Sequence, residues 1–396
     1  DSGELNIENG KIESAASVTI NEKGTLNIKG GTTTLDGEND LINGSVKVSN
    51  GVLNLNKNFN KTTTSVSKFN QSGGTTNIDN SKLVLNTSDS KISGGTINLT
   101  QSAELDINNS SENSSEINST GGKFSIRKGS KFTSTNGTID EASTVTVEEN
   151  AQLEINGTDS NITLDGINDN VKGNLKVTNG TLNLKNNFSK TTTESGTFTQ
   201  TGGVTNISDT SNLTIADKNS LISGGEINVS KDSEFNITNG REHTSRLNIT
   251  GSKFNIKNKS TYTTTGGEIN SDTIITVESA SKLKIDGENA EVNLNGTNDV
   301  IDGHIALAKG NLYISDDLTK VTDVNGNYVQ TGGSMTMNKS SLTLADEASV
   351  ISGGNVKLQD KSILTVSNKG GDITGGNIVI DDTSVLNYLA SKGLVQ

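Results

Sequence analysis

The sequence predicts an all-β protein, a right-handed parallel β-helix in which the chain coils through stacked strands. Three observations lead to this fold class: apolar–polar–apolar triplets recur along the chain, the sequence repeats itself internally, and proline is absent. Only 29% of the 396 residues are hydrophobic, too few for a globular core of this size but enough for a narrow solenoid. The strict periodicity argues against disorder, the other explanation for so polar a chain.

The triplets mark the predicted strands. Val18-Thr19-Ile20 is followed by a polar turn and then by Leu26-Asn27-Ile28, and the same pair of triplets recurs from Val145 and from Ile275. Successive side chains of a strand point to opposite faces, so each triplet has an inward and an outward set. We expect Thr146 to point outward, and the following residues to point inward: Ile20, Ile28, Val147, Leu153, Ile155, Val277 and Ile285. Outward Thr, Asn and Ser side chains should form polar ladders at about 4.8 Å per coil, similar in all copies.

The absence of proline and cysteine further limits the folds and the kinds of site that this chain can form. Proline has no N–H to donate, so its absence fits a chain whose strands are nearly all paired on both sides. Without cysteine there is neither a disulfide nor a thiolate metal site. The chain has a net charge of −13 and its lysines are scattered. It therefore lacks the basic stripe of a nucleic-acid binder. No apolar run of about 18 residues is present, so we expect no membrane insertion by this segment.

A second, longer period divides the chain. Two motifs, Q-[ST]-G-G and I-S-G-G, each occur three times at separations of 129 or 130 residues; they begin at Gln71, Gln200 and Gln330, and at Ile92, Ile222 and Ile351. We therefore predict one continuous β-solenoid over residues 1–396. It contains three superrepeats, called here copy 1 (13–140), copy 2 (141–270) and copy 3 (271–396).

One polar segment interrupts the triplets. Residues 61–68 lie between Phe59 and Phe69, and their counterparts 190–197 lie between Phe188 and Phe198. The segment predicts a loop that projects from the coil. Either the aromatic pair clamps the base of this loop, or both rings fill the interior. In the first case, deletion of residues 61–67 should leave the melting temperature nearly unchanged.

The sequence was searched for catalytic groups because some β-helices cleave polysaccharides. Adjacent acids occur in predicted turns: Glu148 with Glu149, Asp316 with Asp317, and Asp381 with Asp382. Solvated turn acids explain them better than a carboxylate pair. His243 and His304 are distant in sequence, and His243 fits a surface position in a polar loop. Nucleophile-elbow, P-loop and zinc-binding motifs are absent. We expect no enzyme, with no catalytic, cofactor-binding or metal-binding residues and no cofactor.

One recurring loop allows a second interpretation. Residues 36–40 read D-G-E-N-D, and the motif recurs as D-G-I-N-D at 165–169 and N-G-T-N-D at 295–299. Oxygen-rich loops suit calcium, but the spacing is not that of an EF-hand and the nonapeptide calcium repeat is missing. Asp-Gly and Asn-Gly are also common turn formers, so the pattern favours a structural turn and leaves calcium open.

The strand openings carry a family resemblance. Gly94-Gly95-Thr96-Ile97-Asn98-Leu99 and Gly224-Gly225-Glu226-Ile227-Asn228-Val229, together with the lack of Cys and Pro, resemble the passenger domains of bacterial autotransporter adhesins and related repetitive surface adhesins. The resemblance covers the whole chain. It implies an exported protein at the cell surface, held at the outer membrane through a segment outside this chain.

Two functions follow as expectations. The first is an extracellular, adhesive rod that attaches cells to one another or to a host through multivalent polar surfaces. Its partners would be a cell-surface protein or glycan, or a second rod. The alternative is a carbohydrate-binding or polysaccharide-cleaving β-helix. The absence of Trp and the presence of only four Tyr make sugar-stacking platforms scarce and favour the first.

Overall fold

The fold is described from a computed structural model. It covers residues 3–100, 102–108, 112–120, 122–127, 130–167, 169–239, 241–367 and 370–389. The chain forms two compact units, unit 1 from Asp1 to Thr205 and unit 2 from Asn206 to Gln396. The described residues are built from short strands without any helix. None of them therefore forms a helix of the length and apolar character that crossing a bilayer requires.

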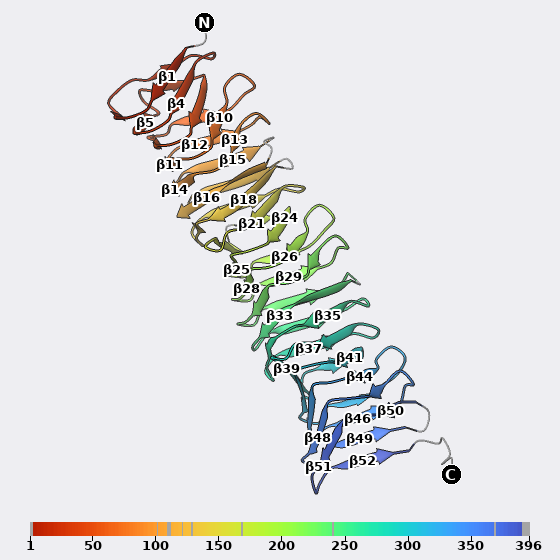
Figure 1. Ribbon diagram of the computed structural model, residues 1–396. Coiled ribbons are helices and arrows are strands. Elements are labelled where there is room, and N and C mark those ends of the chain that lie inside the picture. Colours follow the sequence, from red (N-terminus) through yellow and green to blue (C-terminus); the bar gives the residue numbers. More distant parts are fainter. Residues whose placement is uncertain are drawn as a thin grey trace. The chain divides into compact units, whose positions relative to one another are not determined.

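Each turn of the coil contributes one strand to each of three parallel sheets, called here faces A, B and C (Figure 1). In unit 1, face A contains β1 (Glu4–Ile7), β4 (Thr25–Ile28), β7 (Ser45–Val48), β10 (Phe69–Gln71), β13 (Lys91–Ile92), β18 (Lys131–Asn136), β21 (Gln152–Ile155), β24 (Asn174–Val177) and β27 (Phe198–Gln200). Face B contains β2 (Lys11–Ile12), β5 (Thr32–Asp36), β8 (Val52–Asn56), β11 (Thr75–Asp79), β14 (Thr96–Thr100), β19 (Thr138–Ile139), β22 (Asn161–Asp165) and β25 (Thr181–Lys185). Face C contains β3 (Thr19–Ile20), β6 (Leu41–Ile42), β9 (Asn60–Thr62), β12 (Lys82–Leu85), β15 (Glu104–Asn108), β17 (Lys123–Arg127), β20 (Thr144–Val147), β23 (Asn170–Val171) and β26 (Ser189–Thr191).

Unit 2 has the same three faces. Face A contains β30 (Leu221–Ile222), β35 (Thr261–Thr264), β38 (Lys282–Ile285), β41 (His304–Leu307), β44 (Tyr328–Gln330), β47 (Val350–Ile351) and β50 (Asp372–Ile373). Face B contains β31 (Glu226–Val229), β36 (Gly267–Ile269), β39 (Ala290–Asn295), β42 (Asn311–Ser315), β45 (Ser334–Asn338), β48 (Asn355–Gln359) and β51 (Asn377–Ile380). Face C contains β29 (Asn212–Ile215), β32 (Glu234–Ile237), β34 (Lys253–Ile256), β37 (Ile274–Val277), β40 (Val300–Ile301), β43 (Thr319–Val321), β46 (Ser341–Leu344), β49 (Ile363–Val366) and β52 (Val385–Tyr388). Strand β28 (Val204–Ile207) lies at the division between the units, and β16 (Glu112–Thr120) and β33 (Glu242–Ile249) each bend from face A into face B.

The pairing register gives the length of a turn. Leu5 pairs with Leu26, Leu26 with Val46, and Val46 with Phe69, all in parallel. These steps of 21, 20 and 23 residues are each one turn of the coil. The predicted fold class, an all-β parallel solenoid, is thus confirmed; its right hand, its division into three superrepeats and its continuity over the whole chain stay predictions.

The interior is a set of aliphatic stacks, as the triplet phase predicts. Of the seven residues predicted to point inward, Ile20 is 8% exposed and the other six are fully buried. Thr146, predicted to point outward, is partly exposed between the buried Val145 and Val147. Because one strand step moves every side chain to the opposite face, this agreement confirms the strand register.

The Q-[ST]-G-G motif forms a corner between faces A and B. Gln71 is buried, and its side chain accepts a hydrogen bond from Thr76 Oγ1 at 2.8 Å. Gly74 has φ +69°, and a Cβ there would lie 2.5 Å from the carbonyl oxygen of Gly51 in the preceding turn. Only glycine tolerates both the positive φ and this approach, and Gly51 and Gly180 have a positive φ at the same corner of other turns.

The loop predicted at residues 61–68 is largely part of the coil, so that prediction is wrong. Strand β9 pairs with β12, placing Lys61 beside Leu83, and Lys61, Thr63 and Ser67 are buried. Thr62 and residues 64–66 are exposed. Phe59 and Phe69 are 3% and 1% exposed, which favours the interpretation that both rings fill the interior. The sequence misled because a lysine and a serine hold inward positions, where their polar atoms find partners.

Candidate functional site

The recurring D-G-x-N-D loops are corner clamps. Asp40 Oδ1 accepts a hydrogen bond from Val18 N, one turn earlier, at 2.7 Å, and its Oδ2 accepts from Asp36 N at 2.6 Å. Asp169 makes the same pair of bonds to Val145 N and Asp165 N, at 2.6 and 2.5 Å. Each carboxylate thus ties a corner to the preceding turn.

The third loop repeats the clamp. Asp299 accepts hydrogen bonds from Ile275 N and Asn295 N at 2.8 and 2.6 Å. Burial raises the pKa of Asp169 to about 7 and that of Asp299 to about 6, against the opposing effect of the N–H donors. Within the described chain, which leaves out Asn168 of the second loop, no three His, Asp or Glu side chains gather into a metal site. The contacts favour the structural turn.

Buried lysines form a second corner device, which the sequence analysis did not find. Lys61 Nζ donates to the carbonyl oxygens of Ile42 and Gly44 at 3.3 and 2.8 Å and to Ser67 Oγ at 2.7 Å. Lys190 and Lys320 donate to the equivalent carbonyls of their own copies, with the shorter bond 2.8 Å in both. Burial lowers the pKa of Lys61 and Lys320 to about 8. The recurrence of lysine at this point in all three copies is the signal that would have found it.

His243 is buried, so its predicted surface position is wrong. It lies in β33, where its Nδ1 accepts a hydrogen bond from Ile222 N at 3.2 Å and its Nε2 lies 3.2 Å from Asn239 Oδ1. Burial, with the charge of Arg241, lowers its pKa to about 4. At the equivalent position of copy 1, Asn113 Oδ1 accepts a hydrogen bond from Ile92 N at 2.8 Å. In both copies this residue therefore accepts from a backbone amide of the preceding turn.

The three acid pairs lie at turns, and their side chains are exposed apart from the half-buried Glu148. Asp316 and Asp317 occupy consecutive positive-φ turn positions. Asp381 accepts backbone hydrogen bonds from Asp360, Thr383 and Ser384, and these hold its pKa well below the ordinary value. This is the chemistry of a turn acid, which is ionised and bonded to its own backbone.

Asparagine rows run along face B. Asn54, Asn77, Asn98 and Asn118 lie on successive turns of unit 1. The amide nitrogen of each of the last three donates to the amide oxygen of the turn before, at 2.8, 2.7 and 3.1 Å. In unit 2, Asn248 donates to Asn228 at 2.6 Å. These side chains are half-exposed, so the predicted polar ladder is present on this face in copies 1 and 2. In copy 3 the row reads Asn293, Tyr313, Thr336 and Lys357, so the expectation of similar ladders fails there. A row of fixed amides is a pre-organised array of donors and acceptors.

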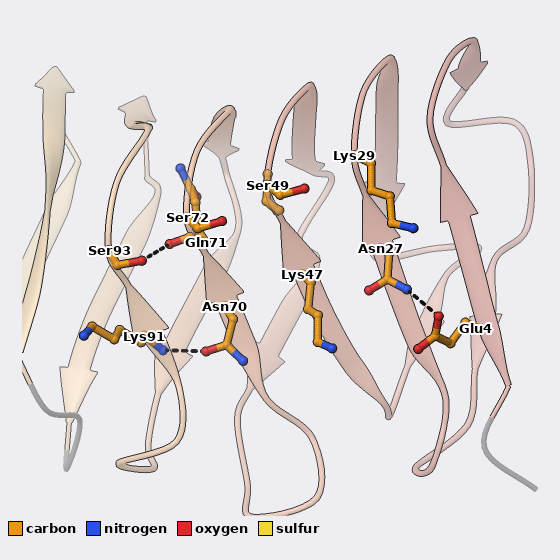
Figure 2. Close-up of a pocket in the computed structure, with 11 residues that line it drawn as sticks. Glu4, Asn27, Lys29, Lys47, Ser49, Asn70, Gln71, Ser72, Lys91 and Ser93 are labelled. Carbon is orange, nitrogen blue, oxygen red and sulfur yellow. Dashed lines mark hydrogen bonds between the residues drawn. The ribbon is translucent and has the colours of Figure 1, made fainter.

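Face A of copy 1 carries a polar groove of about 420 Å³ (Figure 2). Its floor is the copy-1 row, the paired residues Asn27, Lys47, Asn70 and Lys91 on β4, β7, β10 and β13. At the strand ends, Ser49, Ser72 and Ser93 form a parallel line of exposed residues.

Charge is unevenly paired in this groove. Glu4 accepts a hydrogen bond from Asn27 at 3.2 Å, and Lys29 is 3.8 Å from Glu8. Lys47 and Lys91 are exposed and have no acidic partner among the residues that the structure describes. The lining thus contains three lysines and one glutamate, in a chain whose net charge is −13.

The equivalent rows of the other copies differ, so the expectation of similar ladders fails on face A. The copy-2 row consists of Glu154, Lys176 and Thr199. Glu154 is 5% exposed and lies 2.9 Å from Lys176 and 3.4 Å from Lys131. Burial alone would raise the pKa of Glu154, but the bond and charge of Lys176 outweigh it and lower the pKa.

The copy-3 row is largely apolar. It consists of Lys284, Ala306, Val329 and Val350. Lys284 is 2.7 Å from Asp286. Of the three rows, only that of copy 1 therefore presents exposed lysines without acids. Most of these residues are the middle letters of triplets, and they become neighbours only when successive turns are aligned.

No protein-family model and no curated protein matches the chain.

Proposed function

We propose that this chain is the passenger region of a bacterial surface adhesin, a structural β-solenoid outside the cell that attaches cells to one another or to a host. The asparagine row of face B is the observation that carries the proposal. Its amides repeat once per turn and bond to one another, so a partner meets aligned polar groups without ordering them first. Single contacts of this kind contribute about 0.5–1.5 kcal/mol, so useful affinity requires many at once.

The partner in this proposal is a cell-surface protein or glycan, or a second copy of the chain. We propose no catalytic role, because the acid pairs serve as turn residues and the carboxylates with the most strongly raised pKa values, Asp169 and Asp299, bind backbone amides. The alternative function, carbohydrate binding, is favoured by one specific feature, the lysine-containing groove of copy 1.

Attachment of a cell that displays the full chain tests the proposal. The expected result is attachment to host cells, or clumping of the displaying cells, above that of a non-displaying control. Asn77→Ala alone should change attachment less than about twofold, whereas Ala at all four positions of the row should lower it about tenfold or more. Circular dichroism confirms that the variants fold. Equal losses from the single and the fourfold variant would contradict multivalent contact.

A reducing-sugar assay on purified chain tests the enzymatic alternative. No sugar release is expected from any polysaccharide. Release that disappears with Glu149→Gln or Asp317→Asn would overturn the non-enzymatic proposal.

A further inference from the structure

We infer that the copy-1 groove binds an extended acidic polysaccharide, laid across β4, β7, β10 and β13. This inference names a partner class for the proposed adhesin and rests on that proposal only for its biological role. Binding of the polysaccharide itself depends only on the residues of the groove.

The groove offers a repeating set of donors. Each of the four turns adds one side chain of the copy-1 row, and the last three also add a serine at the strand end. The turns are spaced by about 4.8 Å. Lys47 and Lys91 lie two strands apart, about 10 Å along the stack. A linear polymer that crosses the strands therefore meets a cation at every second turn, with Asn70 between them and hydroxyl groups alongside.

That spacing matches a polymer with sparse negative charge. A polysaccharide with one carboxylate or sulfate per disaccharide carries a charge about as often as the groove presents a lysine. Duplex DNA carries one charge per about 1.7 Å and needs a dense basic surface. Only two lysines in the groove lack an acidic partner among the described residues, far fewer cations than such a duplex requires.

The lining also argues against neutral sugars. None of the described residues that line the groove is aromatic, so there is no flat ring on which a sugar or a base can stack. Recognition then depends on charge and hydrogen bonds. Because Lys47 and Lys91 are exposed, it should weaken as salt rises.

Binding of polysaccharides to the purified full chain tests the inference. The probes are hyaluronate, with one carboxylate per disaccharide, polygalacturonate, with one per sugar, uncharged dextran and a short DNA duplex. The groove variant is Lys47→Glu with Lys91→Glu. The control is Lys309→Glu with Lys357→Glu, which makes the same change of charge at exposed lysines of unit 2. All four lysines are exposed, so unchanged melting temperatures are expected and are checked first.

The groove variant should bind hyaluronate and polygalacturonate about tenfold or more weakly, and the control variant within about twofold of the original chain. Uncharged dextran should not bind. The inference is overturned if both variants lose affinity equally, if neither acidic polysaccharide binds, or if DNA binds as tightly and depends on the same lysines. Attachment of displaying cells without polysaccharide binding would remove this inference and leave the adhesin proposal intact. Polysaccharide binding without cell attachment would support this inference and contradict the adhesin proposal.

Discussion

The copy-1 and copy-2 rows of face A share one backbone arrangement and differ in what they present to solvent. In copy 1, Lys47 lies between two asparagines and faces no acid. In copy 2, Glu154 holds both Lys131 and Lys176. The corners of the same copies hardly differ. Lys61 and Lys190 each donate to the two equivalent carbonyl oxygens of their own copy, and Asp40 and Asp169 each accept from the two equivalent backbone amides.

The contrast teaches which positions the solenoid constrains. A buried carbonyl or amide needs a partner in every turn, and loss of that partner costs about 1–3 kcal/mol. An outward side chain packs against little, and its replacement costs about 0.5 kcal/mol or less. The interior and corners therefore repeat, while the faces are free to diverge and to acquire binding surfaces.

The largest effect should come from the interior. Ile155→Asp places an unpaired charge in the core and should lower the free energy of unfolding by several kcal/mol. Thr146→Lys, at an outward position, should change it by less than about 0.5 kcal/mol. Urea denaturation of both variants measures the difference. Similar losses in the two would show that interior and face are not distinguished as described.

The corner lysines should come next. Lys320→Ala leaves the carbonyls of Ile301 and Gly303 without their donor and should cost about 2 kcal/mol. Lys357→Ala, at an exposed position, is the matched control and should be nearly neutral. For the same reason, deletion of residues 61–67, once expected to be harmless, should now destabilise the chain strongly. If the deletion leaves stability unchanged, residues 61–67 form a projecting loop and are not part of the coil.

The corner groups also predict how stability depends on pH. Unfolded aspartates ionise near pH 4, whereas the folded pKa values of Asp299 and Asp169 are about 6 and about 7. Between about pH 4 and 7 the folded chain therefore holds extra protons, and the contribution of these groups to stability falls as pH rises. The lysines have the opposite effect on stability, because burial lowers the pKa of Lys61 and Lys320 to about 8. Above pH 8 the unfolded chain therefore holds the extra protons, and the contribution of these lysines to stability rises with pH.

Urea midpoints at pH 5 and pH 7.5 measure the aspartate contribution. The double variant Asp169→Asn with Asp299→Asn should show a smaller drop in stability across this range than the original chain. An unchanged drop would mean that other groups cause it.

Much of the fold could be predicted because it depends on local pattern. The triplets alone placed Ile28 and Val147 inside, since the alternation of a strand is a property of neighbouring residues. Lys61 and His243 could not be placed this way. Both are polar residues whose burial depends on groups of the preceding turn, about 20 residues away in sequence. The groove was missed for a related reason, because Asn27, Lys47, Asn70 and Lys91 become neighbours only when the turns are aligned.

The smallest effect, and the sharpest test of the comparison, is a gain in copy 2. Glu154→Gln keeps the shape of the side chain but removes the carboxylate that pairs with Lys176, its neighbour on face A. If a lysine without an acidic partner is what binds an acidic polysaccharide, this variant should bind about twice as much hyaluronate per molecule at saturation. It should also lose about 1 kcal/mol of stability with the buried ion pairs. Binding stoichiometry is measured by titration calorimetry on the folded chain. Unchanged stoichiometry would show that the asparagines and serines of copy 1, and not the exposed lysines alone, define the site, because copy 2 has Thr199 where copy 1 has Asn70.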